Sequence, residues 1–220
     1  YSILGDDLQA VEIILDPREK VNSEAGAMIS MDSGINMESE MQGGLMGGLK
    51  RMVSGESFFK STYVNESNKR QKVTFASPYP GKIIPIELSD IGGTFICQRD
   101  AYLCSADGID ISVELTKKMR SGFFGGEGFI LQKLSAPNGL IFVHAGGHVM
   151  KRDLAAGETL KVDTGCLVGF EKTVDYSIEY VGSIKKAFFS GEGVFLTTLT
   201  GPGTVYIQTL PVNDLVSTIY

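Results

Sequence analysis

The chain has 220 residues, 43% of them hydrophobic and 21% charged, a composition that allows a sizeable core and excludes an intrinsically disordered polymer. Its net charge of −6 at pH 7 disfavours a nucleic-acid partner, because binding to a phosphate backbone depends on lysine and arginine. The 27 glycines are typical of many short strands joined by tight turns. We expect a globular protein that binds no nucleic acid.

The three cysteines, Cys97, Cys104 and Cys166, are odd in number and fit no zinc-binding spacing. Two of them lie within apolar strand patterns, where a buried free thiol is the expected state. No signal peptide is visible at Tyr1, and no apolar run reaches the roughly 18 to 20 residues that cross a bilayer. We therefore expect a cytoplasmic protein that meets a membrane only at its surface.

In chain order, the first predicted strand ends at Leu15, before the turn Asp16-Pro17. Residues 35–41 then alternate between apolar and polar side chains, the pattern of a strand with one buried face. Another strand is expected at residues 58–64, and the last one of this segment ends before Ser77-Pro78.

The same order of patterns occurs twice more. Strands that end at Leu88 and Leu154 correspond to the strand that ends at Leu15. The alternating strand returns at residues 109–115 and 174–180. The strand that follows it returns at residues 129–134 and 194–200. An apolar pair follows Gly26-Ala27, Asp100-Ala101 and Gly165-Cys166 at a constant distance before the alternating strand.

An internal triplication usually dictates the whole architecture. We place the repeats at about residues 11–78, 82–147 and 149–211, with no linker between them, so residues 1–220 are expected to form one domain. The predicted fold is all-β: three repeats of antiparallel strands that form a double-stranded β-helix or a jelly-roll-like, pseudo-trimeric barrel.

Each repeat carries a carboxylate in a glycine-rich turn, at Glu56, Glu127 and Glu192. These three residues could surround the pseudo-threefold axis and bind a cation or a basic partner. Alternatively, each carboxylate accepts hydrogen bonds from nearby glycine N–H groups and fixes a sharp turn. We favour the structural interpretation, because a motif present in every repeat usually serves the repeat itself.

His144 and His148 are the only histidines and are separated by Ala145-Gly146-Gly147. On a helix this spacing would suit a metal ion, but two adjacent glycines favour a turn between strands. The chain also lacks the His-x-His pair of metal-binding cupins. The two histidines are therefore weak metal-site candidates.

Apolar side chains gather between the alternating strand and the Gly-Glu turn of each repeat. The candidates are Leu45, Met46, Leu49, Phe123, Phe124, Phe188 and Phe189. If exposed together, they would form a patch for self-association or for a membrane surface. If covered, they would cap the core at one end of the barrel.

Six short motifs occur in order along the chain: residues 24–28, 54–59, 80–85, 125–129, 162–166 and 191–193. In these motifs, from about residue 8 to 211, the chain resembles conserved bacterial and archaeal proteins related to the mitochondrial "altered inheritance of mitochondria" protein. The resemblance implies a fold like that of the tryptophan RNA-binding attenuation protein, with three repeats that form a pseudo-trimer. It also implies a link to inner-membrane organisation through the mitochondrial relative. It supplies no catalytic residues, and RNA binding is not carried over.

No nucleophile elbow or catalytic triad is recognisable. We therefore expect a non-enzymatic scaffold or interaction protein without a cofactor, which forms a homo-oligomer and has a membrane surface or another protein as its further candidate partner. The alternative is a cupin-like barrel that binds a small ligand or a metal.

Overall fold

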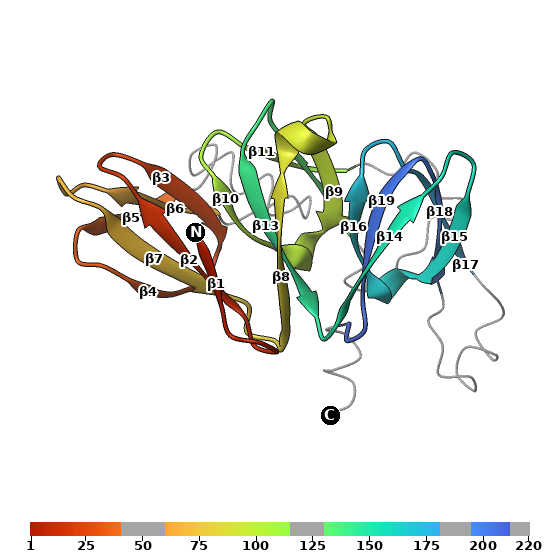
Figure 1. Ribbon diagram of the computed structural model, residues 1–220, viewed down its shortest axis with the longest axis horizontal. Helices are drawn as coiled ribbons and strands as arrows, with labels where there is room; N and C mark the ends of the chain where they lie inside the picture. The colour runs from red at the N-terminus through yellow and green to blue at the C-terminus, as the bar shows by residue number, and fades with distance from the viewer. Residues whose placement is uncertain (41–59, 115–129, 181–194, 212–220) are drawn as a thin grey trace. The chain divides into compact units, whose positions relative to one another are not determined.

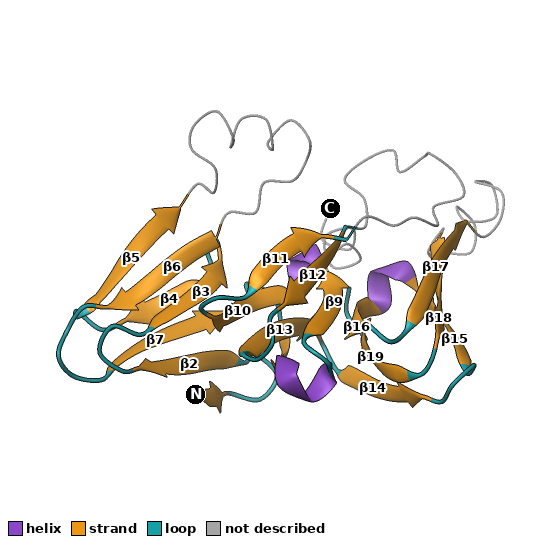
Figure 2. Ribbon diagram, turned by 90° about the horizontal axis from the view of Figure 1, so that it is seen from above, coloured by secondary structure: helices purple, strands orange, loops and turns teal. Residues whose placement is uncertain are grey.

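The computed structural model describes residues 1–40, 60–114, 130–180 and 195–211 (Figures 1 and 2). These residues form β-strands joined by short turns, with three short 3-10 helices and no α-helix among them. The prediction of an all-β protein is confirmed. The strands form four sheets, and the chain divides into two compact units. The first unit comprises residues 1–87, 102–109 and 138–144, and the remaining residues form the second.

The first unit contains a four-stranded sheet in the order β1-β2-β7-β4 (Figure 1). Its neighbouring strands are all antiparallel. The strands are β1 (Ser2–Leu4), β2 (Ala10–Leu15), β7 (Gln71–Ala76) and β4 (Met28–Met31).

The second sheet of this unit has six strands in the order β5-β6-β3-β10-β13-β8. Their bounds are β5 (Ile35–Glu40), β6 (Lys60–Asn65), β3 (Lys20–Glu24), β10 (Tyr102–Ala106), β13 (Leu140–Gly146) and β8 (Gly81–Glu87).

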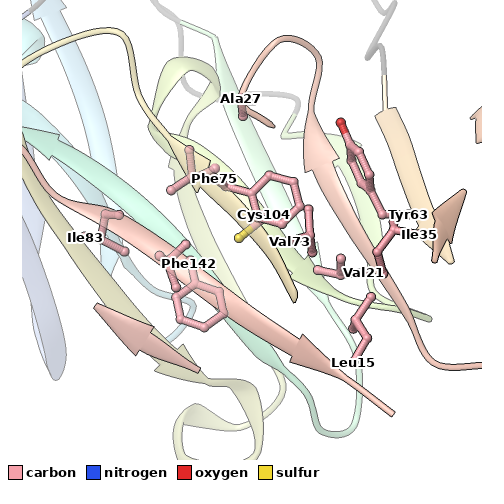
Figure 3. Packing of buried hydrophobic residues seen from close by; sticks show 12 residues of the cluster. Leu15, Val21, Ala27, Ile35, Tyr63, Val73, Phe75, Ile83, Cys104 and Phe142 are labelled. Carbon is pink, nitrogen blue, oxygen red and sulfur yellow. The ribbon is translucent and has the colours of Figure 1, made fainter. Parts of the chain in front are cut away.

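A hydrophobic core holds the two sheets of the first unit together (Figure 3). Val73 and Phe75 come from the four-stranded sheet, whereas Val21 and Tyr63 come from the six-stranded sheet. The rings of Tyr63 and Phe75 meet edge to face with their centroids 5.2 Å apart. Because both rings are almost completely buried, this contact stabilises the unit both through its buried apolar surface and through its edge-to-face geometry.

The second unit repeats this plan with a six-stranded and a three-stranded sheet. The larger sheet has the order β11 (Asp110–Val113), β12 (Leu131–Ser135), β9 (Thr94–Gln98), β16 (Leu167–Glu171), β19 (Gly203–Gln208) and β14 (Val149–Leu154). The smaller sheet has the order β15 (Thr159–Asp163), β18 (Phe195–Thr200) and β17 (Asp175–Tyr180).

The core of the second unit also draws on both of its sheets. Phe170 and Val205 belong to the larger sheet and Leu199 to the smaller one, and all three are fully buried. The ring of Phe170 lies against that of Tyr176, with a centroid distance of 5.0 Å. Each unit is therefore a sandwich of two sheets with its own core.

The alternating patterns predicted the strands well, since residues 35–41, 109–115 and 174–180 correspond to β5, β11 and β17. Several strand boundaries differ by one or two residues, and one of them adds a helix. β8 ends at Glu87, and the fully buried Leu88 begins a 3-10 helix, Leu88–Ile91.

The closed barrel is not found in the described residues. Each of the four sheets has two edge strands, because no first strand pairs with the last strand of its own sheet. The pseudo-trimeric arrangement and the single domain stay predictions. The described part of the chain holds no helix with the length and hydrophobicity needed to cross a bilayer.

Candidate functional site

Two groups of predicted site residues lie outside the described residues. They are the repeat-equivalent carboxylates and the apolar candidates: Glu56, Glu127, Glu192, Leu45, Met46, Leu49, Phe123, Phe124, Phe188 and Phe189. Their proposed roles stay predictions.

The two histidines lie in different surroundings. His144 is buried in β13 and donates a hydrogen bond to the backbone carbonyl of Tyr79, and its burial lowers the pKa to about 4. Its Nε2 atom is buried and has no hydrogen-bond partner among the described residues. His148 is exposed in the turn before β14, where its backbone N–H donates to Thr209 Oγ1. Within the described ranges, no three His, Cys, Asp or Glu residues come together as metal ligands, so a site at these histidines stays a prediction.

No disulfide joins the three cysteines, all of which lie in the described residues. Cys97 and Cys104 are completely buried, as predicted, and burial raises the pKa of both thiols. Both are therefore protonated at neutral pH and poorly reactive. Cys166 is only partly buried.

A buried polar row crosses the junction between β3 and β10 in the first unit. Thr62 Oγ1 donates to Asn22 Oδ1 over 2.7 Å, and Asn22 Nδ2 donates to Asp107 Oδ1 over 3.1 Å. The Tyr102 hydroxyl donates to the Asn22 carbonyl over 3.3 Å and lies 2.9 Å from Ser105 Oγ. The hydrogen bond from Asn22 holds the pKa of Asp107 below its ordinary value. Asn22 and Ser105 are fully buried, so their polar atoms depend on these partners.

The matching junction in the second unit, between β9 and β16, is apolar. Ile96 lies opposite Phe170, and Cys97 lies opposite Gly169. A side chain at Gly169 would clash with the Phe95 ring and with the Ile96 carbonyl, so glycine permits this close approach of the two strands. Both internal junctions are antiparallel, and most of the paired residues on both strands are buried.

Two of the edge strands, β4 and β15, occupy the place in their small sheets that the joined strands occupy in the six-stranded sheets. β4 pairs only with β7 in the described chain and forms one end of its sheet. Its apolar side chains are unusually open: Ile29 is 60% exposed and Met31 42%. An edge strand also presents a row of unpaired backbone N–H and C=O groups, which can accept a further strand.

β15 is the second edge strand considered, with β18 as its one partner among the described strands. Lys161 lies at its centre, exposed and 3.9 Å from the carboxylate of Glu179. An exposed ion pair of this kind contributes little to stability. These two edges are the candidate functional site, because each offers backbone groups that bind an extended segment without any catalytic chemistry.

Sequence reasoning did not identify these edges, although one signal pointed to β4. The apolar pair after Gly26-Ala27 matches buried pairs at the start of β10 and β16. What the sequence could not show is that Ile29, the second residue of the pair in β4, is exposed.

Comparison with solved structures gives a close match in fold. An X-ray structure of a Streptococcus pyogenes protein, determined in a structural-genomics programme, has a TM-score of 0.81 and 24% sequence identity to this chain. The match covers 99% of this chain and 96% of the other, and at this identity it establishes the fold alone. No curated protein matches the sequence.

A family profile described as mitochondrial biogenesis AIM24 matches residues 1–210. The match extends through all the described strands of both units. It agrees with the resemblance seen in the dispersed sequence motifs. The chain therefore belongs to the mitochondrial biogenesis AIM24 family.

Proposed function

We propose that this protein is a non-enzymatic scaffold that associates with further copies of itself through its open sheet edges. The observation that carries the proposal is the exposure of Ile29, at 60%, on an edge strand that pairs with a single strand in the described part of the chain. Folded proteins usually protect such edges with charged residues, proline or a covering loop. An exposed isoleucine on an edge is the opposite arrangement and favours a partner strand.

We also propose that the chain forms one domain of three repeats, a pseudo-trimer, at about residues 11–78, 82–147 and 149–211. The positions of β-bulges support this arrangement. A register shift occurs once in β4, once in β10 and once in β16, each time directly after the first residue of the strand. A repeated scaffold of this kind provides many equivalent attachment points.

A membrane surface is the second partner in the proposal. The description of the family as mitochondrial biogenesis supports a role in membrane organisation. Flotation with vesicles of neutral and of anionic lipids, compared with lipid-free protein, tests this part. If the protein stays at the bottom of the gradient with both lipids, the membrane role is wrong.

Light scattering coupled to size-exclusion chromatography tests self-association. We expect a mass that is a multiple of the single chain and that falls on dilution. A mass of one chain at every concentration would contradict the scaffold. Stoichiometric metal in the purified protein, lost in His144→Ala, would instead support the alternative of a cupin-like metal-binding protein.

A further inference from the structure

We propose that strand β15 of one copy pairs antiparallel with strand β4 of a second copy, with Met31 opposite Lys161. This inference rests on the proposed function, because it names the partner of the open edges: a second copy of this chain. The new junction would have the register that the chain already uses twice inside itself.

The first argument is the composition of the sheets. One six-stranded sheet consists of the group β5-β6-β3 joined to the group β10-β13-β8 through β3 and β10. The other consists of β11-β12-β9 joined to β16-β19-β14 through β9 and β16. The two small sheets are the halves left over: β17-β18-β15 ends at β15, and β4-β7-β2 ends at β4, with β1 added on its far side. Joining β15 to β4 completes a third sheet of the same order.

The second argument fixes the register. In both internal junctions, the residue after the bulge lies opposite the fourth residue of the partner strand: Cys104 opposite Ser23, and Gly169 opposite Cys97. In β4 the residue after the bulge is Ser30, and the fourth residue of β15 is Val162. The same rule therefore places Ser30 opposite Val162, Met31 opposite Lys161 and Asp32 opposite Leu160. No like charges face one another in this register.

The third argument is the solvent exposure of side chains at equivalent positions of β4, β10 and β16. The residue skipped by the bulge is Leu103 in β10 and Val168 in β16, with exposures of 3% and 0%, whereas Ile29 in β4 is 60% exposed. The residues equivalent to Met31, Ser105 and Phe170, are fully buried. The exposed apolar side chains of β4 thus occupy the positions that a partner strand covers in the two internal junctions.

The arrangement is head to tail. Each copy offers one β4 edge and one β15 edge, which are different surfaces, so a pair formed by one contact still has a free edge of each kind. Such heterologous contacts close into a ring or continue as a filament. A simple twofold dimer is not expected.

Mixtures of single-cysteine variants test the register. A chain with Met31→Cys is mixed with a chain with Lys161→Cys and oxidised, and a second mixture pairs Ser30→Cys with Val162→Cys. Adjacent cross-strand pairs alternate between wide and narrow spacing, so one of these pairs has the closer spacing that favours a disulfide. The matched control mixes Met31→Cys with Thr159→Cys, which lies on the same strand two residues out of register. Wild-type protein shows the background from Cys166.

We expect a covalent dimer on a non-reducing gel for at least one in-register mixture and a loss of that band in the control. Absence of the band in both mixtures, while light scattering still shows oligomers, would overturn this junction and leave the scaffold intact. Monomers throughout would contradict both proposals. The double variant Met31→Cys/Lys161→Cys separates the remaining case: a disulfide within a single monomeric chain would show that the two edges pair intramolecularly and would overturn a second copy as the partner.

Discussion

The two internal strand junctions share a backbone register but differ in the chemistry of their side chains. At β3 and β10, the row through Asn22, Thr62 and Ser105 is polar and hydrogen-bonded. At β9 and β16, the corresponding positions include Ile96 and Phe170, which pack in an apolar core. The backbone ladder therefore defines the junction, and the side chains decide how each junction responds to substitution. The predictions below start from this difference.

The largest effect is expected at the apolar junction. Phe170→Ala removes a fully buried ring and should lower the free energy of unfolding by about 3 to 5 kcal/mol, because a cavity remains in a packed core. Urea unfolding followed by circular dichroism measures the loss. Phe170→Leu serves as the control and should cost less. A loss for Phe170→Ala below that of Phe170→Leu would contradict the packing described for this unit.

The first unit also differs from the apolar junction of the second unit in containing a buried ionisable side chain, that of His144. Burial lowers the pKa of His144 from 6.5 to about 4, so the folded protein prefers the neutral ring. Below pH 6.5 the unfolded chain binds the proton first, and stability should fall as the pH drops from about 6.5 to about 4 and then level off. The total contribution is about 3 kcal/mol.

Urea unfolding at several pH values checks this contribution. In His144→Gln, the loss of stability between pH 6.5 and pH 4 should be smaller than in the wild type. His148→Gln, at an exposed position, is the control and should retain the wild-type dependence. Equal pH profiles for His144→Gln and the wild type would show that the buried ring does not control acid stability.

The polar junction should show a different signature. Asn22→Leu leaves the Thr62 hydroxyl without its buried acceptor and should cost about 1 to 3 kcal/mol of unfolding free energy. Adding Thr62→Val should restore part of this loss, because the double variant no longer contains a buried hydroxyl without a hydrogen-bond partner. Additive losses in a double-mutant cycle would mean that the hydrogen bond is not the coupled interaction.

The smallest change in stability is expected at the open edge. Ile29→Asp alters an exposed side chain and should change the unfolding free energy by no more than about 0.5 kcal/mol. It should nevertheless weaken self-association about tenfold or more, which corresponds to about 1.4 kcal/mol. Ile14→Asp is the matched control, since Ile14 is 42% exposed on β2, an interior strand of the same sheet. Equal dissociation constants for the two variants, measured by sedimentation, would show that β4 is not part of the interface.

The strands that were predicted best are those with regular alternation. β5, β11 and β17 each present one face to a core, and apolar and polar residues therefore alternate along their sequences. β3 gave no such signal, because Asn22 and Ser23 are polar and yet fully buried. Their burial depends on hydrogen-bond partners far along the chain, among them Thr62 and Tyr102, which no local pattern reveals.

The open edges could not be predicted from the sequence for a different reason. The apolar pair at the start of β4 looks the same in sequence as those of β10 and β16. Whether such a pair is covered depends on a neighbouring strand, and therefore on topology. The carboxylates at Glu56, Glu127 and Glu192, which the sequence made prominent, lie outside the described residues.

The order of strands in the junctions has a consequence for the nascent chain. β3 is synthesised well before β10, and β9 well before β16, so each strand leaves the ribosome long before its partner exists. A waiting β3 presents the polar Asn22 and Ser23, whereas a waiting β9 presents Phe95, Ile96 and Cys97 in succession. Exposed apolar strands of this kind are prone to wrong pairing and aggregation. Of these two strands, β9 is therefore the one that a chaperone would have more reason to shield during synthesis.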